Sequence, residues 1–233
     1  MIRNFLFSVF FFLGIIFISI IFLPSFFLPQ KIVLIGGKIM GYWSGFCLRI
    51  FLSTKIIVKG NENIIRNEKF FIVSSHQSMF ETFFLQTIFN SPIFILKKEL
   101  LKIPIFGWYL RKIGSISIDR NKTTKNNLGF FDKISQIVNK SNRPLIIFPQ
   151  GTRLKPEDRT PFKKGAARIY EELKIKCLPI AISSGNTWPK KGPLKPSLNI
   201  IISILEPVEP GLQKKIFLEK IQENIYSELD RLG

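Results

Sequence analysis

The chain opens with a long run of apolar residues. No charged residue occurs between positions 5 and 30, and at about 1.5 Å per residue the segment 5–23 forms a helix of roughly 28 Å. The hydrocarbon core of a bilayer is about 30 Å thick, so the pattern predicts a membrane-anchoring helix that ends near Pro24 and Pro29. A cleavable signal peptide is the alternative, but its apolar run is shorter and is followed by small residues at a cleavage site.

A second apolar segment, 32–52, contains Lys38 and Arg49 together with several glycines. Because charges within a membrane span are costly, this pattern favours a half-buried interfacial helix or the second arm of a re-entrant hairpin. A core helix of the following domain is the other interpretation. We therefore divide the chain into an N-terminal membrane anchor or helical hairpin, residues 1–53, and an α/β domain, residues 54–233.

Short apolar runs alternate with helical patterns through the rest of the chain. The expected strands are 69–74, 93–96, 115–118, 145–148, 177–182 and 198–205, and the expected helices are 81–89, 99–112, 123–140, part of 161–174 and 213–232. Strands of this length separated by helices are typical of an α/β fold with a mainly parallel sheet flanked by helices. No internal repeat or long linker divides this region, so one domain is predicted.

The composition excludes several classes of protein and indicates on which side of a membrane the chain lies. The chain has 233 residues, 46% of them hydrophobic, and a net charge of +18, which excludes wholesale disorder. Cys47, Cys177 and the single histidine cannot supply four zinc ligands or a disulfide framework. Basic residues follow the first apolar run, whereas Arg3 alone precedes it, so the positive-inside rule places most of the chain on the cytoplasmic side. These basic residues are Lys31, Lys38, Arg49, Lys55 and Lys59.

The histidine, His76, lies five positions before Glu81. Within one helix the two side chains would point about 140° apart, so they can meet only if His76 lies in the loop after the strand and Glu81 in the first turn of the next helix. In that arrangement the carboxylate could orient the imidazole, which could then remove a proton from a hydroxyl. A capping or core histidine fits this cluster equally well.

Three further clusters follow expected strands. The segment 114–120 ends in Asp119 and Arg120, and the segment 148–153 reads Phe-Pro-Gln-Gly-Thr-Arg and ends in Arg153. Arginines at strand ends, beside backbone amides, suit a phosphate group, so a shared anion site is favoured over two solvated arginines. The segment 178–183, Leu-Pro-Ile-Ala-Ile-Ser, is apolar and fits either the core or a hydrophobic ligand.

The clusters together carry a family resemblance. Histidine-x4-acid, Gly-x-x-x-Ile-Asp-Arg, Phe-Pro-x-Gly-Thr-Arg and a Leu-Pro-Ile strand, in this order, resemble the glycerolipid acyltransferases, and most closely the bacterial 1-acyl-sn-glycerol-3-phosphate acyltransferase type. The resemblance covers roughly residues 69–184. The family usually has Asp at the position of Glu81 and Glu at the position of Gln150. Any role of Gln150 must therefore be hydrogen bonding.

The resemblance implies an activity and roles for single residues. A fatty acyl group would pass from acyl-CoA or acyl carrier protein to the sn-2 hydroxyl of lysophosphatidic acid, giving phosphatidic acid, without a metal or a bound cofactor. His76 would be the general base and Glu81 would orient it. The implied substrate-binding residues are Lys97, Arg120, Gln150, Gly151, Thr152 and Arg153.

The charge fits a lipid substrate. Basic residues greatly outnumber acids between Lys97 and Lys125, and such a surface attracts an anionic leaflet, the phosphates of coenzyme A or an acidic carrier protein. We therefore expect the chain at the inner cell membrane, with its catalytic domain on the cytoplasmic face. A membrane-tethered binder of nucleic acid or another anionic polymer is the rival class, but the sequence has no nucleic-acid-binding motif. A serine hydrolase would need a Gly-x-Ser-x-Gly elbow, which is absent. A sibling acyltransferase acting on another lysolipid, on glycerol 3-phosphate or on an aminolipid stays open.

Overall fold

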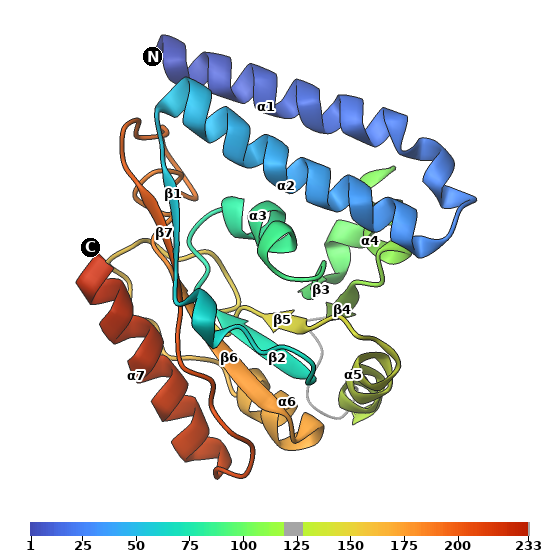
Figure 1. Cartoon of the computed structure of the whole chain (residues 1–233), viewed down its shortest axis with the longest axis vertical. Coiled ribbons are helices and arrows are strands. Elements are labelled where there is room, and N and C mark those ends of the chain that lie inside the picture. Colours follow the sequence, from blue (N-terminus) through green and yellow to red (C-terminus); the bar gives the residue numbers. More distant parts are fainter. Residues whose placement is uncertain (119–127, 233) are drawn as a thin grey trace.

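A computed structural model describes residues 1–118 and 128–232, apart from the side chain of Leu128 (Figure 1). Its helices are α1 (Ile2–Ile21), α2 (Gln30–Leu52), α3 (Phe80–Ile88), α4 (Phe106–Lys112), α5 (Leu128–Lys140), α6 (Gly165–Leu173) and α7 (Lys214–Leu232), with 3₁₀ turns η1 (Leu23–Phe26), η2 (Asn61–Asn63) and η3 (Lys98–Lys102). Its strands are β1 (Ile56–Lys59), β2 (Phe70–Ser74), β3 (Ile93–Lys97), β4 (Ile116–Ile118), β5 (Leu145–Ile147), β6 (Lys176–Ile182) and β7 (Ile200–Ile204).

The described strands form one seven-stranded sheet in the order β1-β7-β6-β2-β5-β3-β4. Neighbouring strands pair in parallel, except that β7 runs antiparallel to β6. Val73 of β2 lies opposite Ile147 of β5 and Pro179 of β6. The strands β6, β2, β5, β3 and β4 therefore end at one edge of the sheet, where ligand sites of open α/β folds usually form.

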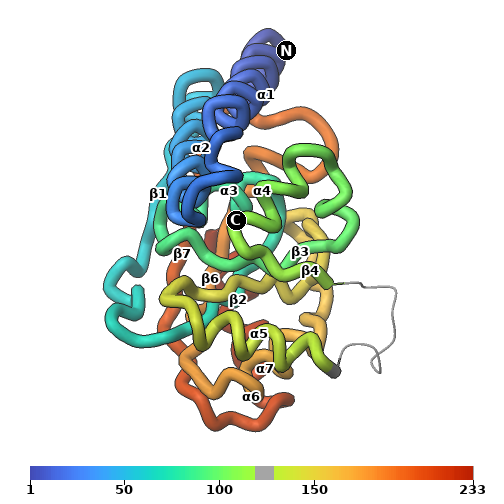
Figure 2. The backbone as a smooth tube through the Cα atoms, turned by 90° about the vertical axis from the view of Figure 1, so that its right-hand side faces the viewer, coloured from blue at the N-terminus to red at the C-terminus, as the bar shows by residue number. Residues whose placement is uncertain are grey.

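Alternate residues of the strands feed two separate cores. In β2, Phe71 and Val73 join a cluster beneath α5, α6 and α7, whereas Ile72 joins a cluster shared with α1, α2 and α3. This division follows from the side-chain period of two along a strand. Helices thus cover both faces of the sheet, and Figures 1 and 2 show α1 and α2 lying together on the side opposite α5 and α6.

The N-terminal helices form a hairpin that packs directly on the α/β part. A side chain at Gly41 of α2 would place its Cβ 2.6 Å from the carbonyl oxygen of Phe83 in α3, so the glycine permits a backbone approach that no larger residue allows. Phe7 and Phe11 of α1 each pack edge-on against Trp188, with ring centroids 5.1 Å apart. The glycines of the second apolar segment therefore serve helix packing.

The outer face of α1 stays uncovered. Within the described residues, α1 is the one helix whose length and composition would let it cross a membrane, and 17% of its most apolar window is buried. Its exposed side chains include Phe5, Phe10, Phe12, Leu13, Ile16, Phe17, Ile20 and Ile21. Helix α2 packs one face against α1 and α3 and exposes Tyr42, Phe46 and Ile50.

The mainly parallel α/β fold is confirmed, with differences in detail. Strand β1 was not expected, and the expected helix 99–112 is divided into η3 and α4 around Pro104, as a proline inside a helix pattern requires. The first apolar helix begins earlier and ends earlier than 5–23. The beginning of the expected helix 123–140 lies outside the described residues.

Replacing Gly41 by Ala will destabilise the protein, because the new methyl group must push α2 away from the α3 backbone. Such overpacking costs about 1–3 kcal/mol of unfolding free energy. Thermal unfolding in detergent, followed by circular dichroism, will show the loss as a lower Tm. The matched control is Gly129→Ala in α5, where an added Cβ meets nothing within 4 Å and helix propensity predicts no loss. Equal Tm values for the two variants would contradict this packing role.

Candidate active site

Polar residues gather where three neighbouring strands end. His76 follows β2, the turn 148–153 follows β5, and Ser184 follows β6. Lys97 ends β3, the next strand of the sheet, and its side chain is exposed. The order of the sheet thus brings segments that are distant in the sequence to a single edge.

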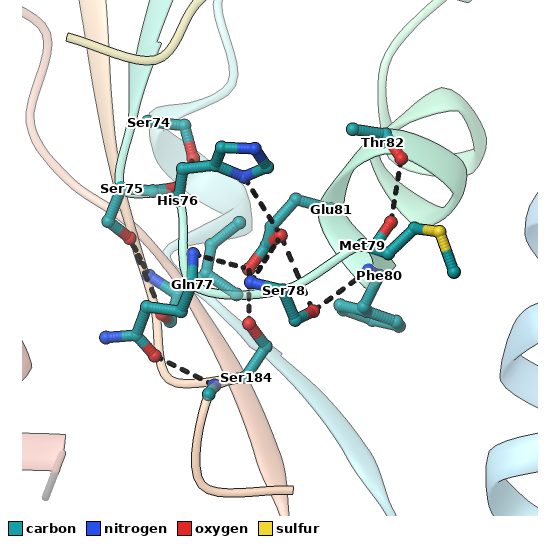
Figure 3. Close-up of polar contacts among 12 residues, drawn as sticks. Ser74, Ser75, His76, Gln77, Ser78, Met79, Phe80, Glu81, Thr82 and Ser184 are labelled. Atoms are coloured by element: carbon teal, nitrogen blue, oxygen red, sulfur yellow. Dashed lines mark hydrogen bonds and ion pairs between the residues drawn. The ribbon is translucent and has the colours of Figure 1, made fainter. Parts of the chain in front are cut away.

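His76 and Glu81 are in contact. His76 Nδ1 lies 3.3 Å from Glu81 Oε2, with His76 in the loop and Glu81 in the first turn of α3. The His76 ring stacks on Phe148, with centroids 4.1 Å apart and an interplanar angle of 18°. Figure 3 shows the second ring nitrogen pointing away from Glu81. One nitrogen is therefore held by the carboxylate, while the other is available to a ligand.

The Glu81 carboxylate is fully buried, whereas the His76 side chain is 16% exposed. The backbone N–H of Ser78 lies 3.1 Å from both carboxylate oxygens, and that of Gln77 donates to Oε1 at 3.3 Å. The hydroxyl of Ser184 also bonds Oε1 (Figure 3). A buried carboxylate needs such donors in place of water, and here they come from the loop after β2 and from the end of β6.

Gln150 connects His76 to the C-terminal helix. Its Oε1 accepts the backbone N–H of His76 at 2.7 Å, and its Nε2 lies 3.5 Å from the hydroxyl of Tyr226 in α7. Burial raises the pKa of the Tyr226 phenol above its ordinary value, so the phenol stays protonated and donates to the carbonyl of Thr160. Gln150 thus connects the His76 backbone to Tyr226 through hydrogen bonds of its neutral amide.

The turn after β5 presents cationic groups. Gly151 has a φ of +74°, and the ammonium group of Lys163 lies so near that an added Cβ would be 2.8 Å from its Nζ. Lys190 donates to the hydroxyl of Thr152 at 2.9 Å. Arg153, next in the chain, is half-buried and forms no ion pair with the residues the structure describes. Leu154, which follows this turn, donates its N–H to the His76 carbonyl at 2.9 Å, so the turn and its cationic residues adjoin the loop that carries His76.

Not every expected site residue can be located. Arg120, with Asp119, lies outside the described residues, and within those residues the Lys97 side chain forms no hydrogen bond or ion pair with the turn. Among residues 1–118 and 128–232 no group of three or more His, Cys, Asp or Glu side chains is placed to hold a metal ion.

Sequence reasoning missed four residues that surround the site. Ser184 directly follows the Leu-Pro-Ile strand, so its position at a strand end was a usable signal. Ser78, inside the His76–Glu81 interval, was another candidate donor. Lys190 and Tyr226 gave no such signal, because the fold alone brings them to Thr152 and Gln150.

The chain is similar to known acyltransferases. A family model described as Acyltransferase matches residues 55–183. The 1-acyl-sn-glycerol-3-phosphate acyltransferase of Saccharomyces cerevisiae is 30% identical over 214 residues, covering 86% of this chain and 70% of that protein. The protein of the same name from Pseudomonas aeruginosa is 35% identical over 153 residues, covering 64% of this chain and 59% of that protein. The crystal structure of the 1-acyl-sn-glycerophosphate acyltransferase of Thermotoga maritima has the same fold, with a TM-score of 0.79, 24% identity and coverage of 100% of this chain and 98% of the other.

Replacing Gln150 by Leu will leave the His76 backbone N–H without its acceptor. An unpaired buried donor costs about 1–3 kcal/mol of unfolding free energy, so Tm will fall. Gln150→Glu is the matched control, because it keeps an acceptor oxygen in the same place and should lose less. Thermal unfolding of both variants tests the bridge, and a Leu variant as stable as the Glu variant would contradict it.

Proposed function

The chain belongs to the acyltransferase family, and from this membership we propose that it transfers a fatty acyl group from an acyl thioester to the sn-2 hydroxyl of lysophosphatidic acid. The product is phosphatidic acid. The observation that carries the proposal is the contact between the buried Glu81 carboxylate and His76 Nδ1, beside a cationic turn. The proposed acceptor is the one named for the relatives from Saccharomyces cerevisiae and Pseudomonas aeruginosa, which are 1-acyl-sn-glycerol-3-phosphate acyltransferases.

The reaction uses His76 as a general base. Glu81 accepts a hydrogen bond from the Nδ1–H group, which leaves the lone pair of Nε2 to take the proton of the acceptor hydroxyl. As Nε2 takes the hydroxyl proton, the oxygen attacks the thioester carbonyl and forms a tetrahedral intermediate. Collapse of the intermediate breaks the carbon–sulfur bond, and the imidazolium returns the proton to the leaving thiolate. Glu81 stabilises the transient imidazolium by its charge.

The phosphate of the acceptor binds at the turn after β5. Gly151, Thr152 and Arg153 form its proposed binding site: the guanidinium matches phosphate geometry, and Gly151, whose N–H donates to the Phe148 carbonyl at 3.0 Å, shapes the turn. Lys190, already bonded to Thr152, adds a second cation. Lys97, at the end of β3, and Arg120, in the segment after β4, complete the proposed set of phosphate-binding residues.

Membrane lipids supply the acceptor, and the membrane surface of the protein extends beyond α1. The Tyr109 hydroxyl of α4 donates to the Ser19 carbonyl of α1 at 2.5 Å, and Lys112 donates to the carbonyl of Phe26 at 3.1 Å. Beside these contacts η3, α4 and the connection between them expose apolar side chains, Leu100, Ile103, Ile105, Phe106 and Trp108. We assign this apolar surface, with its neighbouring lysines, to the cytoplasmic leaflet of the inner cell membrane. The donor is acyl-CoA or acyl carrier protein, and no bound cofactor takes part.

Replacing His76 by Ala will lower the rate of acyl transfer by about 10²–10⁴-fold, the usual contribution of a general base. The assay is release of thiol from a long-chain acyl thioester, with and without lysophosphatidic acid. Cys47 and Cys177 are buried, so the protein's own thiols interfere little. Near-ultraviolet circular dichroism checks the fold. A folded variant with wild-type activity would contradict the role of His76, and release without acceptor would indicate a thioesterase.

Replacing Arg153 by Ala will raise the apparent KM for lysophosphatidic acid by about tenfold, as expected for one lost charge-assisted contact, while kcat changes less. Lys190→Ala should move KM in the same direction. The matched control is Lys191→Ala, which removes the same charge from the adjacent residue, exposed and without a contact to Thr152.

Monoacylglycerol, which lacks the phosphate, should not distinguish these variants from wild type. An unchanged KM would show that the phosphate binds elsewhere, and a preference for glycerol 3-phosphate or another lysolipid would point to a sibling activity.

A further inference from the structure

We infer that Ser184 is a positioning residue of the active site, holding the carboxylate of Glu81 against the sheet so that His76 faces the acceptor hydroxyl. The inference rests on the proposed function and deepens it. The Ser184 hydroxyl bonds Glu81 Oε1, and both residues are completely buried. An ionised carboxylate only accepts hydrogen bonds, so the hydroxyl of Ser184 is the donor.

The two carboxylate oxygens receive different partners. Oε2 faces His76 Nδ1, whereas Oε1 receives the N–H of Gln77 and the hydroxyl of Ser184. The backbone N–H of Ser78 lies 3.1 Å from both oxygens, and the Ser78 hydroxyl lies 3.5 Å from Oε2. With one oxygen bonded to Ser184, rotation of the carboxylate away from His76 would break a charge-assisted bond. Ser184 therefore fixes which oxygen the imidazole meets.

Ser184 differs from the other donors in its origin. Gln77 and Ser78 belong to the same loop as His76, whereas Ser184 follows β6, an inner strand of the sheet. That segment is itself held: the Ser184 carbonyl accepts the N–H of Trp188 at 2.8 Å, and the N–H of Gly185 donates to Gln77 Oε1 at 2.9 Å. Ser184 thus ties the His76–Glu81 pair to a part of the fold that does not belong to the loop.

The test is Ser184→Ala in the full chain, assayed by thiol release in detergent–lipid micelles. We expect kcat to fall about tenfold, as for loss of one hydrogen bond to a charged group, with the KM for lysophosphatidic acid and for the acyl thioester nearly unchanged. Ser183→Ala is the matched control. Its hydroxyl is also buried but accepts the N–H of Ile201 at 3.2 Å and does not touch the pair, so its kcat should stay at the wild-type value.

A double-mutant cycle separates positioning from general support of the fold. In the background of Glu81→Ala, removal of the Ser184 hydroxyl should have no further effect on kcat, because the carboxylate on which it acts is gone. Equal losses in both backgrounds, or a wild-type kcat for Ser184→Ala, would overturn the inference. Ser184→Cys, nearly equal in size with a weak S–H donor, gives an intermediate kcat and carries the test if the Ala variant does not fold.

The outcomes for the proposed function and for this inference are distinct. Wild-type protein that transfers no acyl group to any acceptor would overturn both. Active wild-type protein with an unaffected Ser184→Ala variant would overturn this inference alone. A wild-type preference for another acceptor leaves the comparison of kcat values valid with that acceptor.

Discussion

The burial of one negative charge constrains the whole site. Glu81 has no exposed surface, and an unpaired carboxylate in such a position would be far too costly. Its donors come from the loop after β2 and from the end of β6, so these segments must lie together. The parallel pairing of β2 with β6 supplies that proximity, since Ser74 lies opposite Ile180. The register of the sheet therefore also determines how the imidazole is oriented.

The N-terminal hairpin also packs against the segments that surround Glu81. Helix α3, which carries Glu81, packs between the sheet and α2, and Gly41 lets the two helix backbones approach closely at Phe83. On the other side, Trp188 packs against Phe7 and Phe11 and is bonded to the Ser184 carbonyl. The apolar helix α1 is thus connected to Ser184 through Trp188, and to α3, which carries Glu81, through α2.

How much of this the sequence predicts depends on the distance between the partners along the chain. The separation of His76 and Glu81 by five residues predicts that they can meet only at a loop–helix junction; the sequence left a capping or core histidine equally open, and the structure shows the junction. Ser184 lies 103 residues from Glu81, and Tyr226 lies 76 residues from Gln150. Such contacts depend on strand order and helix placement, which periodicity does not specify. Strand β1, Ile56–Lys59, was not predicted; it lies at the edge of the sheet and pairs with β7, which is far away along the chain.

The neutral side chain at position 150 has a structural consequence. Because an amide has both an acceptor and a donor, Gln150 accepts the His76 N–H and also reaches the Tyr226 hydroxyl, which an ionised carboxylate could do only as an acceptor from both sides. The raised pKa of Tyr226 keeps that phenol protonated, so its own proton remains directed at the Thr160 carbonyl. The chain of hydrogen bonds therefore has one direction, from Gln150 to Tyr226 to Thr160. It joins α7, which lies beyond the segment 55–183 matched by the family model, to the backbone of His76 without placing a second negative charge beside it.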